Sequence, residues 1–325
     1  MIVPAYWAEA RLQQRTHRRQ ITVRRFGWSD LGPAEAQAHA DARVREAFDR
    51  IVAGERLPRS ERKVGYGGSQ GLPIREEIVD RQGDAVITRN SYGALCLNTP
   101  DVLFADVDFD EVVDDGLSWR AVTVVFLVAV ALGLWTRSIG LGIGALFAGF
   151  VLAVIVVGWL RKRAHAANGG PEVRARHRID AFVAARPDWL LRLYRTPAGF
   201  RLLALHRTFG PREPEVAESF RALGGDPVYA TMCAVQNCFR ARVSPKHWRI
   251  GLKRKIAPTV AVWRPEHAHL PQRQAWLVDY ARAALGYASC RYVATFGAGA
   301  ADPKADAVRQ LHDALCRADE DLPIA

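Results

Sequence analysis

Two long uncharged runs in the middle of the chain constrain its fold more than any other feature. Residues 121–136 and 138–160 contain no charged side chain, and Arg137 alone separates them. A bilayer core about 30 Å thick requires roughly 20 apolar residues in a helix. The second run meets this length by itself, and the first meets it if its helix begins slightly earlier. We therefore predict a transmembrane helical hairpin over residues 117–163, with helices at about 117–136 and 138–160.

The flanks and small residues of the two runs suit a membrane hairpin. Three tryptophans lie near the expected helix ends: Trp119, Trp135 and Trp159. Tryptophan concentrates at membrane–water interfaces. Gly140 with Gly144, and Ala145 with Gly149, form small-xxx-small pairs, which would let helices approach closely or let two copies form a homo-oligomer. The alternative is a hairpin buried in a soluble core, but such helices seldom carry so long an uncharged run.

Charge sets the expected orientation of the hairpin. Arg161, Lys162 and Arg163 close the second run, whereas the turn carries only Arg137. Positively charged flanks stay on the cytoplasmic side. We therefore predict a multi-pass protein of the inner (cytoplasmic) membrane, with both termini cytoplasmic and the lipid bilayer as a partner. Five cysteines, an odd number without the spacing of a disulfide framework, agree with a reducing compartment.

Outside the hairpin the pattern is that of an α+β cytoplasmic domain, with a mixed or antiparallel sheet and flanking helices. Residues 1–116 form its first half, residues 164–325 form its second half, and residues 164–171 read as a linker leaving the membrane. Because both ends of a hairpin lie on one side of the bilayer, the two halves can pack together. We favour this single split domain, and two independent domains are the alternative.

Local patterns locate the expected elements. Strands are expected at residues 20–28, 76–81, 85–88, 94–98, 101–108, 190–195, 199–206, 238–243 and 259–263. Helices are expected at residues 33–53, 178–185, 214–223, 227–237, 272–285 and 305–318. Ser29 or Asp30 is the expected N-cap of the first helix.

The net charge of the chain is +11. A basic balance favours membrane surfaces, nucleic acid or phosphorylated ligands, and does not choose among them. Residues 245–249 mix cations with Trp248 and could grip phosphates or lipid headgroups. A solvated basic face is the alternative interpretation.

Two further motifs are weaker. The glycine-rich loop at residues 66–71 lacks the Lys-Ser/Thr of a P-loop. Cys233 with Cys238, and His267 with His269, lack the tight paired spacing of a structural zinc site. Buried thiols and surface histidines are the simpler interpretation of these four residues.

An acidic pair offers the clearest candidate chemistry. Asp106 and Asp108 are separated by one residue on a predicted strand, so both side chains point to the same face. Asp110 shares that parity. Two carboxylates there could hold divalent cations, which favour hard oxygen ligands. A solvated, acidic strand end is the alternative.

These residues also resemble motifs of the archaeo-eukaryotic primase superfamily, the primase–polymerase group. The acidic pair of that family, h-D-x-D/E, is matched by residues 104–108. Its histidine-containing strand has a candidate at residues 196–206, although Arg201 falls where the histidine usually comes and His206 arrives late. A third acid before Val-Tyr and a downstream F-R…S-x-K are matched by Asp226 and by residues 239–246. The motifs occur in family order, interrupted by the hairpin.

The resemblance implies a site and a cofactor. Asp106, Asp108 and Asp226 would bind two divalent metals, Mg²⁺ or Mn²⁺, and would be catalytic together with His206. The nucleotide would be bound by Arg201, Arg240 and Lys246. Charge-assisted hydrogen bonds from such cations to phosphate make the assignment chemically sensible.

Two functions follow as expectations. The first is a membrane-anchored, metal-dependent nucleotidyltransferase-like enzyme that acts on nucleotides or nucleic acid. The second is a non-catalytic integral membrane protein, whose basic cytoplasmic domain binds a protein, nucleic acid or anionic lipid. The position of Asp226 relative to Asp106 separates them.

Overall fold

The computed structural model describes the chain apart from residues 1–2, 17–18, 62–71, 110–114, 168 and 260–261. The chain divides into two compact units. The first unit combines Met1–Val107 with Ala185–Ala325, and the second comprises Asp108–Ala184. Segments far apart in the sequence therefore fold together in the first unit.

The second unit is helical. It contains α2 (Asp115–Thr136), α3 (Ile139–Ala167) and α4 (Gly170–Ala184). Two spans, Trp119–Thr136 and Ile139–Leu160, have mean hydropathies of 1.8 and 2.6, and in the 18-residue window of each span 6% and 0% of the residues are buried. Both helices are long and apolar enough to cross a membrane, and their exposure does not fit a buried soluble hairpin. The predicted linker at 164–171 is wrong, because α3 continues to Ala167 and α4 begins at Gly170.

Small residues bring α2 and α3 together. A Cβ added to Gly142 would lie 3.3 Å from the Ala129 carbonyl oxygen, and one added to Gly149 would lie 2.8 Å from a Val125 methyl carbon. Of the expected small residues, Gly149 thus lies at the helix contact. Gly144 has no described atom within 4 Å of its Cβ position.

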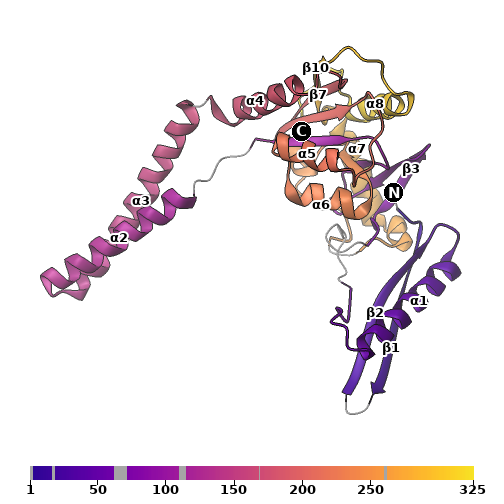
Figure 1. Cartoon of the computed structure of the whole chain (residues 1–325), viewed down its shortest axis with the longest axis horizontal. Helices are drawn as coiled ribbons and strands as arrows, with labels where there is room; N and C mark the ends of the chain where they lie inside the picture. Colours follow the sequence, from indigo (N-terminus) through magenta and orange to yellow (C-terminus); the bar gives the residue numbers. More distant parts are fainter. Residues whose placement is uncertain (1–2, 17–18, 62–71, 110–114, 168, 260–261) are drawn as a thin grey trace. The chain divides into compact units, whose positions relative to one another are not determined.

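The first unit contains three sheets (Figure 1). One is the hairpin of β1 (Tyr6–Thr16) and β2 (Arg19–Ser29). The second has the order β10-β7-β8-β6, with bounds Arg291–Phe296, Leu191–Thr196, Gly199–Ala204 and Phe104–Asp108. The third has the order β3-β4-β5-β9, with bounds Glu77–Gln82, Ala85–Arg89, Leu95–Thr99 and Phe239–Arg242. The third sheet and the β10-β7-β8 pairings are antiparallel, which agrees with the expected α+β class.

Helix α1 (Pro33–Val52) packs on the β1–β2 hairpin (Figure 1). Its apolar side contributes Val44 and Phe48 to a core shared with Val23. Gly27 permits the close approach, since a Cβ there would lie 2.2 Å from the Ala40 nitrogen. Strand β1 was not predicted, although Ala8, Ala10 and Leu12 alternate with polar residues and pack against this core. The expected side-chain cap is also absent: Gly32 is the N-cap.

Four helices complete the first unit: α5 (Pro214–Leu223), α6 (Pro227–Gln236), α7 (Pro271–Ala284) and α8 (Pro303–Cys316). All four fall within two residues of their predicted bounds. Strand β10 was missed, because its side chains are half exposed and half intermediate. The expected strand at 259–263 is not found at residues 259, 262 and 263, and residues 260–261 lie outside the description.

Candidate functional site

A pocket of about 360 Å³ is lined by residues of both four-stranded sheets and α6. We call it the inter-sheet pocket. Its lining comprises Glu76, Asn90, Ser91, Tyr92, Cys96, Asp106, Tyr229, Arg240 and Arg242. Two strands that carry predicted site residues, β6 with Asp106 and β9 with Arg240, therefore supply part of its wall, and the turn that leads into β5 supplies another part.

The turn between β4 and β5 is organised by Asn90. Its side-chain oxygen accepts hydrogen bonds from the backbone N–H groups of Tyr92 and Ala94, at 3.2 and 3.0 Å. Gly93 has φ +94°, a left-handed conformation that glycine adopts without strain, and the Trp276 ring leaves no space for a Cβ there. The turn therefore holds Ser91 and Tyr92 at the pocket.

Arg240 on β9 is buried against Glu76. Its Nη2 donates to both carboxylate oxygens of Glu76, at 2.9 and 2.6 Å, and Nη1 donates to the Asn98 amide oxygen. Thr88 donates its hydroxyl to Glu76 as well. Both charged side chains are 6% exposed, so the positive charge of Arg240 is already balanced.

Asp106 is paired with Arg201. The guanidinium Nε and Nη2 donate to the two carboxylate oxygens of Asp106 at 2.7 and 2.9 Å. The Asp106 side chain is 41% exposed, whereas that of Arg201 is 4% exposed. Burial alone would raise the pKa of Asp106, but the charge and hydrogen bonds of Arg201 outweigh it and the pKa is lowered. Both oxygens accept hydrogen bonds from Arg201, so a divalent cation at this carboxylate would have to share it with the guanidinium.

Arg242 and Arg249 supply cationic donors without matching acids. Arg242 lies on β9, and Arg249 ends a short 3-10 helix, His247–Arg249. The Nε of Arg242 and Nη1 of Arg249 are buried and have no hydrogen-bond partner among the described residues. The pKa of Arg249 is lowered, mainly by burial and next by repulsion from Arg242. Two like charges are therefore neighbours at this site.

Aromatic side chains stand beside these cations. Tyr92 and Trp248 pack with ring centroids 5.4 Å apart, and Trp248 is 52% exposed. The Lys246 ammonium lies 5.3 Å from the Trp248 ring centroid, a cation–π distance. The expected basic segment 245–249 thus flanks the Tyr92 side of the pocket.

Tyr229 ties the two sheets together at the pocket. Its hydroxyl lies 3.2 Å from the Phe104 carbonyl oxygen on β6 and 3.0 Å from the Arg240 carbonyl oxygen on β9. Burial raises its pKa well above the usual range, so the hydroxyl stays protonated and can donate. This residue of α6 consequently fixes the spacing of the walls.

The remaining predicted site residues lie elsewhere or serve other contacts. A Cβ on Gly225 would lie 3.6 Å from the Asp106 carbonyl oxygen, so the chain entering α6 is close to β6. However, the Asp226 carboxylate caps α6 by accepting from the Val228 N–H at 2.8 Å. Asp108 is exposed at the end of β6 and begins the second unit. A joint metal site of these carboxylates stays a prediction.

His206 follows β8 and packs between aromatic rings. Its ring centroid is 4.5 Å from that of Trp189 and 5.4 Å from that of Phe209. Burial lowers its pKa, which favours the neutral form. It does not line the inter-sheet pocket, whereas Arg201, at the position of the family's histidine, contacts Asp106 of that pocket directly.

A buried group behind Arg201 was missed by the sequence reasoning. Arg201 Nη1 lies 3.3 Å from His312 Nε2, and the ligand atoms of His312, Cys290 and Cys316 lie within 4.8 Å of one another. The available signal was the spacing of His312 and Cys316, four residues apart on one helical face. Sequence alone could not assign Cys290 to this group, because it lies just before β10 and only tertiary packing brings it to α8.

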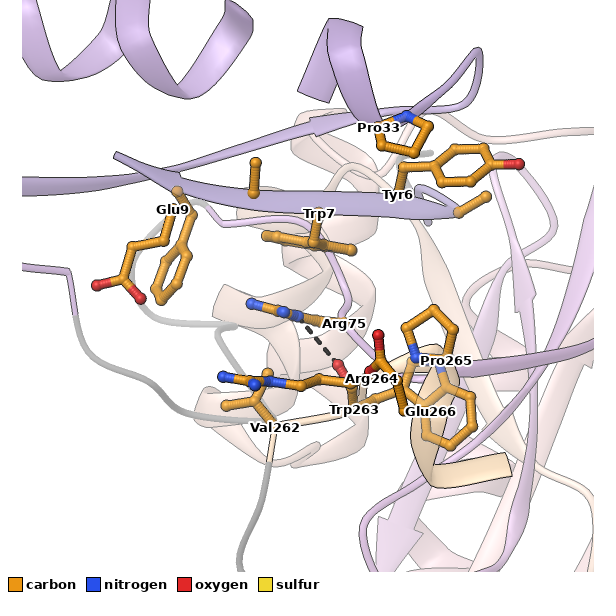
Figure 2. Close-up of a pocket in the computed structure, with 13 residues that line it drawn as sticks. Tyr6, Trp7, Glu9, Pro33, Arg75, Val262, Trp263, Arg264, Pro265 and Glu266 are labelled. Atoms are coloured by element: carbon orange, nitrogen blue, oxygen red, sulfur yellow. Dashed lines mark hydrogen bonds between the residues drawn. The ribbon is translucent and has the colours of Figure 1, made fainter. Parts of the chain in front are cut away.

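A second pocket, also about 360 Å³, lies between β1 and residues 262–266 (Figure 2). Figure 2 shows the Arg75 guanidinium beneath the Trp7 ring, 4.9 Å from its centroid. Arg75 Nε donates to the Trp263 carbonyl oxygen at 3.2 Å, and burial lowers the pKa of Arg75 to about 10. Its lining has two arginines and two glutamates, and the inter-sheet pocket is likewise lined by two arginines and two acids. The two pockets differ in that, among the described residues, Arg75 and Arg264 have no buried N–H without an acceptor, whereas Arg242 has one.

No protein-family model, curated protein or solved structure matches this chain.

Proposed function

We propose that this chain is a membrane-anchored nucleotide-binding protein, with α2 and α3 as its anchor and the inter-sheet pocket as its binding site. The observation that carries the proposal is Arg242, which lines the pocket and keeps a buried Nε–H donor that lacks an acceptor among the described residues. Such a donor costs about 1–3 kcal/mol of stability, and a bound phosphate would satisfy it. Arg249 lies outside the pocket lining and adds positive charge near Arg242.

The surrounding charges favour an anion. Glu76 is engaged by Arg240, and Asp106 is engaged by Arg201. Arg242 also attracts Asp106 through its charge, but its Nε donor has no acceptor among the described residues. Guanidinium groups bind phosphate oxygens through charge-assisted hydrogen bonds, which are stronger than neutral ones.

The aromatic side chains favour a nucleotide over inorganic phosphate. A volume of about 360 Å³ lies within the range of small-molecule sites. Trp248 is half exposed and packed on Tyr92, so it offers a ring face for a base. Base stacking on an aromatic side chain contributes about 1–3 kcal/mol.

Nucleotide titration of the full chain in detergent tests the proposal. We expect saturable binding of a fluorescent nucleoside triphosphate. Arg242→Ala should weaken it about 10- to 100-fold, since a hydrogen bond to a charged group contributes about 1.5–3 kcal/mol. The matched control is Arg282→Ala, an exposed arginine on α7 away from the pocket lining.

Two results would overturn the assignment. One is the absence of nucleotide binding by the unaltered chain. The other is equal affinity in the Arg242→Ala and Arg282→Ala variants. Binding only to vesicles with anionic lipid, with no competition by nucleotide, would replace the nucleotide with a lipid headgroup.

Nucleotidyl transfer is a second candidate function, and one observation favours it: Asp106 lines the same pocket as Arg240. It would require Arg201 to release the Asp106 carboxylate. Asp106→Asn should then abolish any Mn²⁺-dependent product formation from nucleoside triphosphates. If the unaltered chain binds nucleotide and forms no product, the binding function stands without catalysis.

A further inference from the structure

Three buried side chains converge behind Arg201, outside the inter-sheet pocket. Cys290 immediately precedes β10, and His312 and Cys316 lie on successive turns of α8. Their exposed fractions are 0%, 0% and 1%. Their ligand atoms all lie within 4.8 Å of one another. Two thiols and an imidazole are three of the four donors of a tetrahedral Cys/His zinc site, and among the described residues no fourth His, Cys, Asp or Glu joins this group.

The orientation of His312 supports metal ligation. Its Nδ1 lies 3.1 Å from an Asp313 carboxylate oxygen. Asp313 is itself held by the Tyr194 hydroxyl and, at 2.9 Å, by Arg192. A carboxylate that accepts from Nδ1 fixes the tautomer in which Nε2 carries the lone pair, as in many zinc sites. Here Nε2 is the atom that faces the thiols.

One ligand–ligand distance agrees with tetrahedral zinc. Cys316 Sγ lies 3.5 Å from His312 Nε2. Zinc bonds of about 2.3 Å to sulfur and about 2.0–2.1 Å to nitrogen place such ligands about 3.5–3.6 Å apart. The distances from Cys290 Sγ to these two atoms are at most 4.8 Å.

The local charge balance also suits a divalent ion. Two thiolates and Zn²⁺ sum to zero. Arg201 is already paired with Asp106, and Arg192 is paired with Asp313. Arg201 Nη1 lies 3.3 Å from His312 Nε2, so zinc at Nε2 would replace this contact, and Nη1 would keep its hydrogen bond to the Arg242 carbonyl oxygen. A neutral cluster avoids the cost of a buried uncompensated charge.

We propose that Cys290, His312 and Cys316 bind one structural Zn²⁺ ion. This goes beyond nucleotide binding, because none of the three lines the inter-sheet pocket. The ion would join α8 to the start of β10, directly behind the arginine that holds Asp106. It would thereby fix Arg201, whose Nη1 also donates to the Arg242 carbonyl oxygen at 2.9 Å.

Elemental analysis of the full chain, purified without a histidine tag or chelator, tests the proposal. We expect about one zinc per chain. Cys316→Ser and Cys290→Ser should each lower zinc content at least about 10-fold, as removal of a thiolate ligand requires. Cys238→Ser is the matched control, since Cys238 is a fully buried cysteine outside this cluster, and it should keep its zinc.

A second measurement covers variants that fail to fold. Treating the unaltered chain with a mercurial thiol reagent should release one equivalent of zinc to a colorimetric chelator. Cobalt reconstitution should give thiolate-to-cobalt charge-transfer bands. Absence of metal, copper in place of zinc, or unchanged zinc in both folded ligand variants would overturn the proposal. Zinc content is measured without nucleotide, so a negative result for zinc leaves the proposed nucleotide-binding pocket untouched.

Discussion

At the scale of single residues, the inter-sheet pocket is a set of compensated charges with one exception. Arg240 and Asp106 each have a bound counter-charge. Arg242 retains a buried donor without an acceptor among the described residues. Whether the pocket binds an anion therefore depends on which of its charged side chains already have a partner in the fold, and not on the number of arginines that line it.

The Arg240–Glu76 pair yields the first prediction, on stability. Arg240→Ala should lower the free energy of unfolding by about 3–5 kcal/mol, because it leaves a buried carboxylate without its cation. Thermal or denaturant unfolding of the full chain in detergent measures this. Arg240→Met combined with Glu76→Met should recover much of the loss. A fall below about 1 kcal/mol for the single variant would contradict the buried pair.

The second prediction concerns pH and Asp106. Its folded-state pKa is lowered by Arg201, below the unfolded value of about 3.9. The pair therefore stabilises the fold above about pH 4, and this stabilisation is lost as the pH falls through the folded-state pKa. The melting temperature of Asp106→Asn should lie below that of the unaltered chain by a constant amount from pH 5 to 8. This difference in melting temperature should become smaller below about pH 4. A difference that becomes larger there would contradict the ion pair of Asp106 with Arg201.

Sequence reasoning reached several pocket residues but not their partners. Asp106, Arg201 and Arg240 were singled out from short motifs. Their partnerships were not visible, because Arg201 is 95 residues from Asp106 and Arg240 is 164 residues from Glu76. Such pairs depend on tertiary packing, which local pattern does not encode.

At the scale of elements, regular helices and strands were predictable where apolar periodicity was strong. Helix α5 shows this, because the apolar residues Val216, Phe220 and Leu223 recur with helical spacing. Pro214 marks the start of the helix and Gly224 marks its end. Strand β10 was missed because none of its side chains is buried. Strand β1 was missed although Ala8, Ala10 and Leu12 form an alternating apolar face against α1. The segment at 164–171 was misread because its small residues, typical of loops, continue helices α3 and α4 here.

The third prediction concerns the packing of α1 on β2. Gly27→Ala should destabilise the hairpin by about 1–3 kcal/mol or more, because the added Cβ would overlap the backbone of α1. Limited proteolysis within α1, together with the melting temperature, reports this. Gly286→Ala is the control, since its Cβ position has no described atom within 4 Å. Equal protease resistance in the two variants would contradict the close approach.

At the scale of the whole molecule, the two units have different surfaces. The second unit exposes large apolar side chains along α2 and α3, as a bilayer-spanning hairpin requires. The first unit buries its apolar residues in several clusters. This contrast supports the proposal that α2 and α3 anchor the chain in a membrane.

The fourth prediction is topological. The five native cysteines are buried, so an impermeant maleimide should label mainly introduced thiols. In intact cells, Thr136→Cys in the hairpin turn should be labelled, whereas Ala281→Cys on α7 should require permeabilisation, because positive flanks stay cytoplasmic. Alkaline carbonate should leave the chain in the membrane fraction. Labelling of both sites in intact cells, or release by carbonate, would contradict the anchor.

The most direct test of the central claim is the affinity difference between a nucleoside and its triphosphate, measured in the full chain and in Arg242→Ala. If Arg242 binds phosphate, the triphosphate should bind the unaltered chain more tightly than the nucleoside. Arg242→Ala should reduce that preference about 10- to 100-fold while leaving nucleoside affinity nearly unchanged. An equal loss for both ligands, or no preference for the triphosphate, would contradict the account.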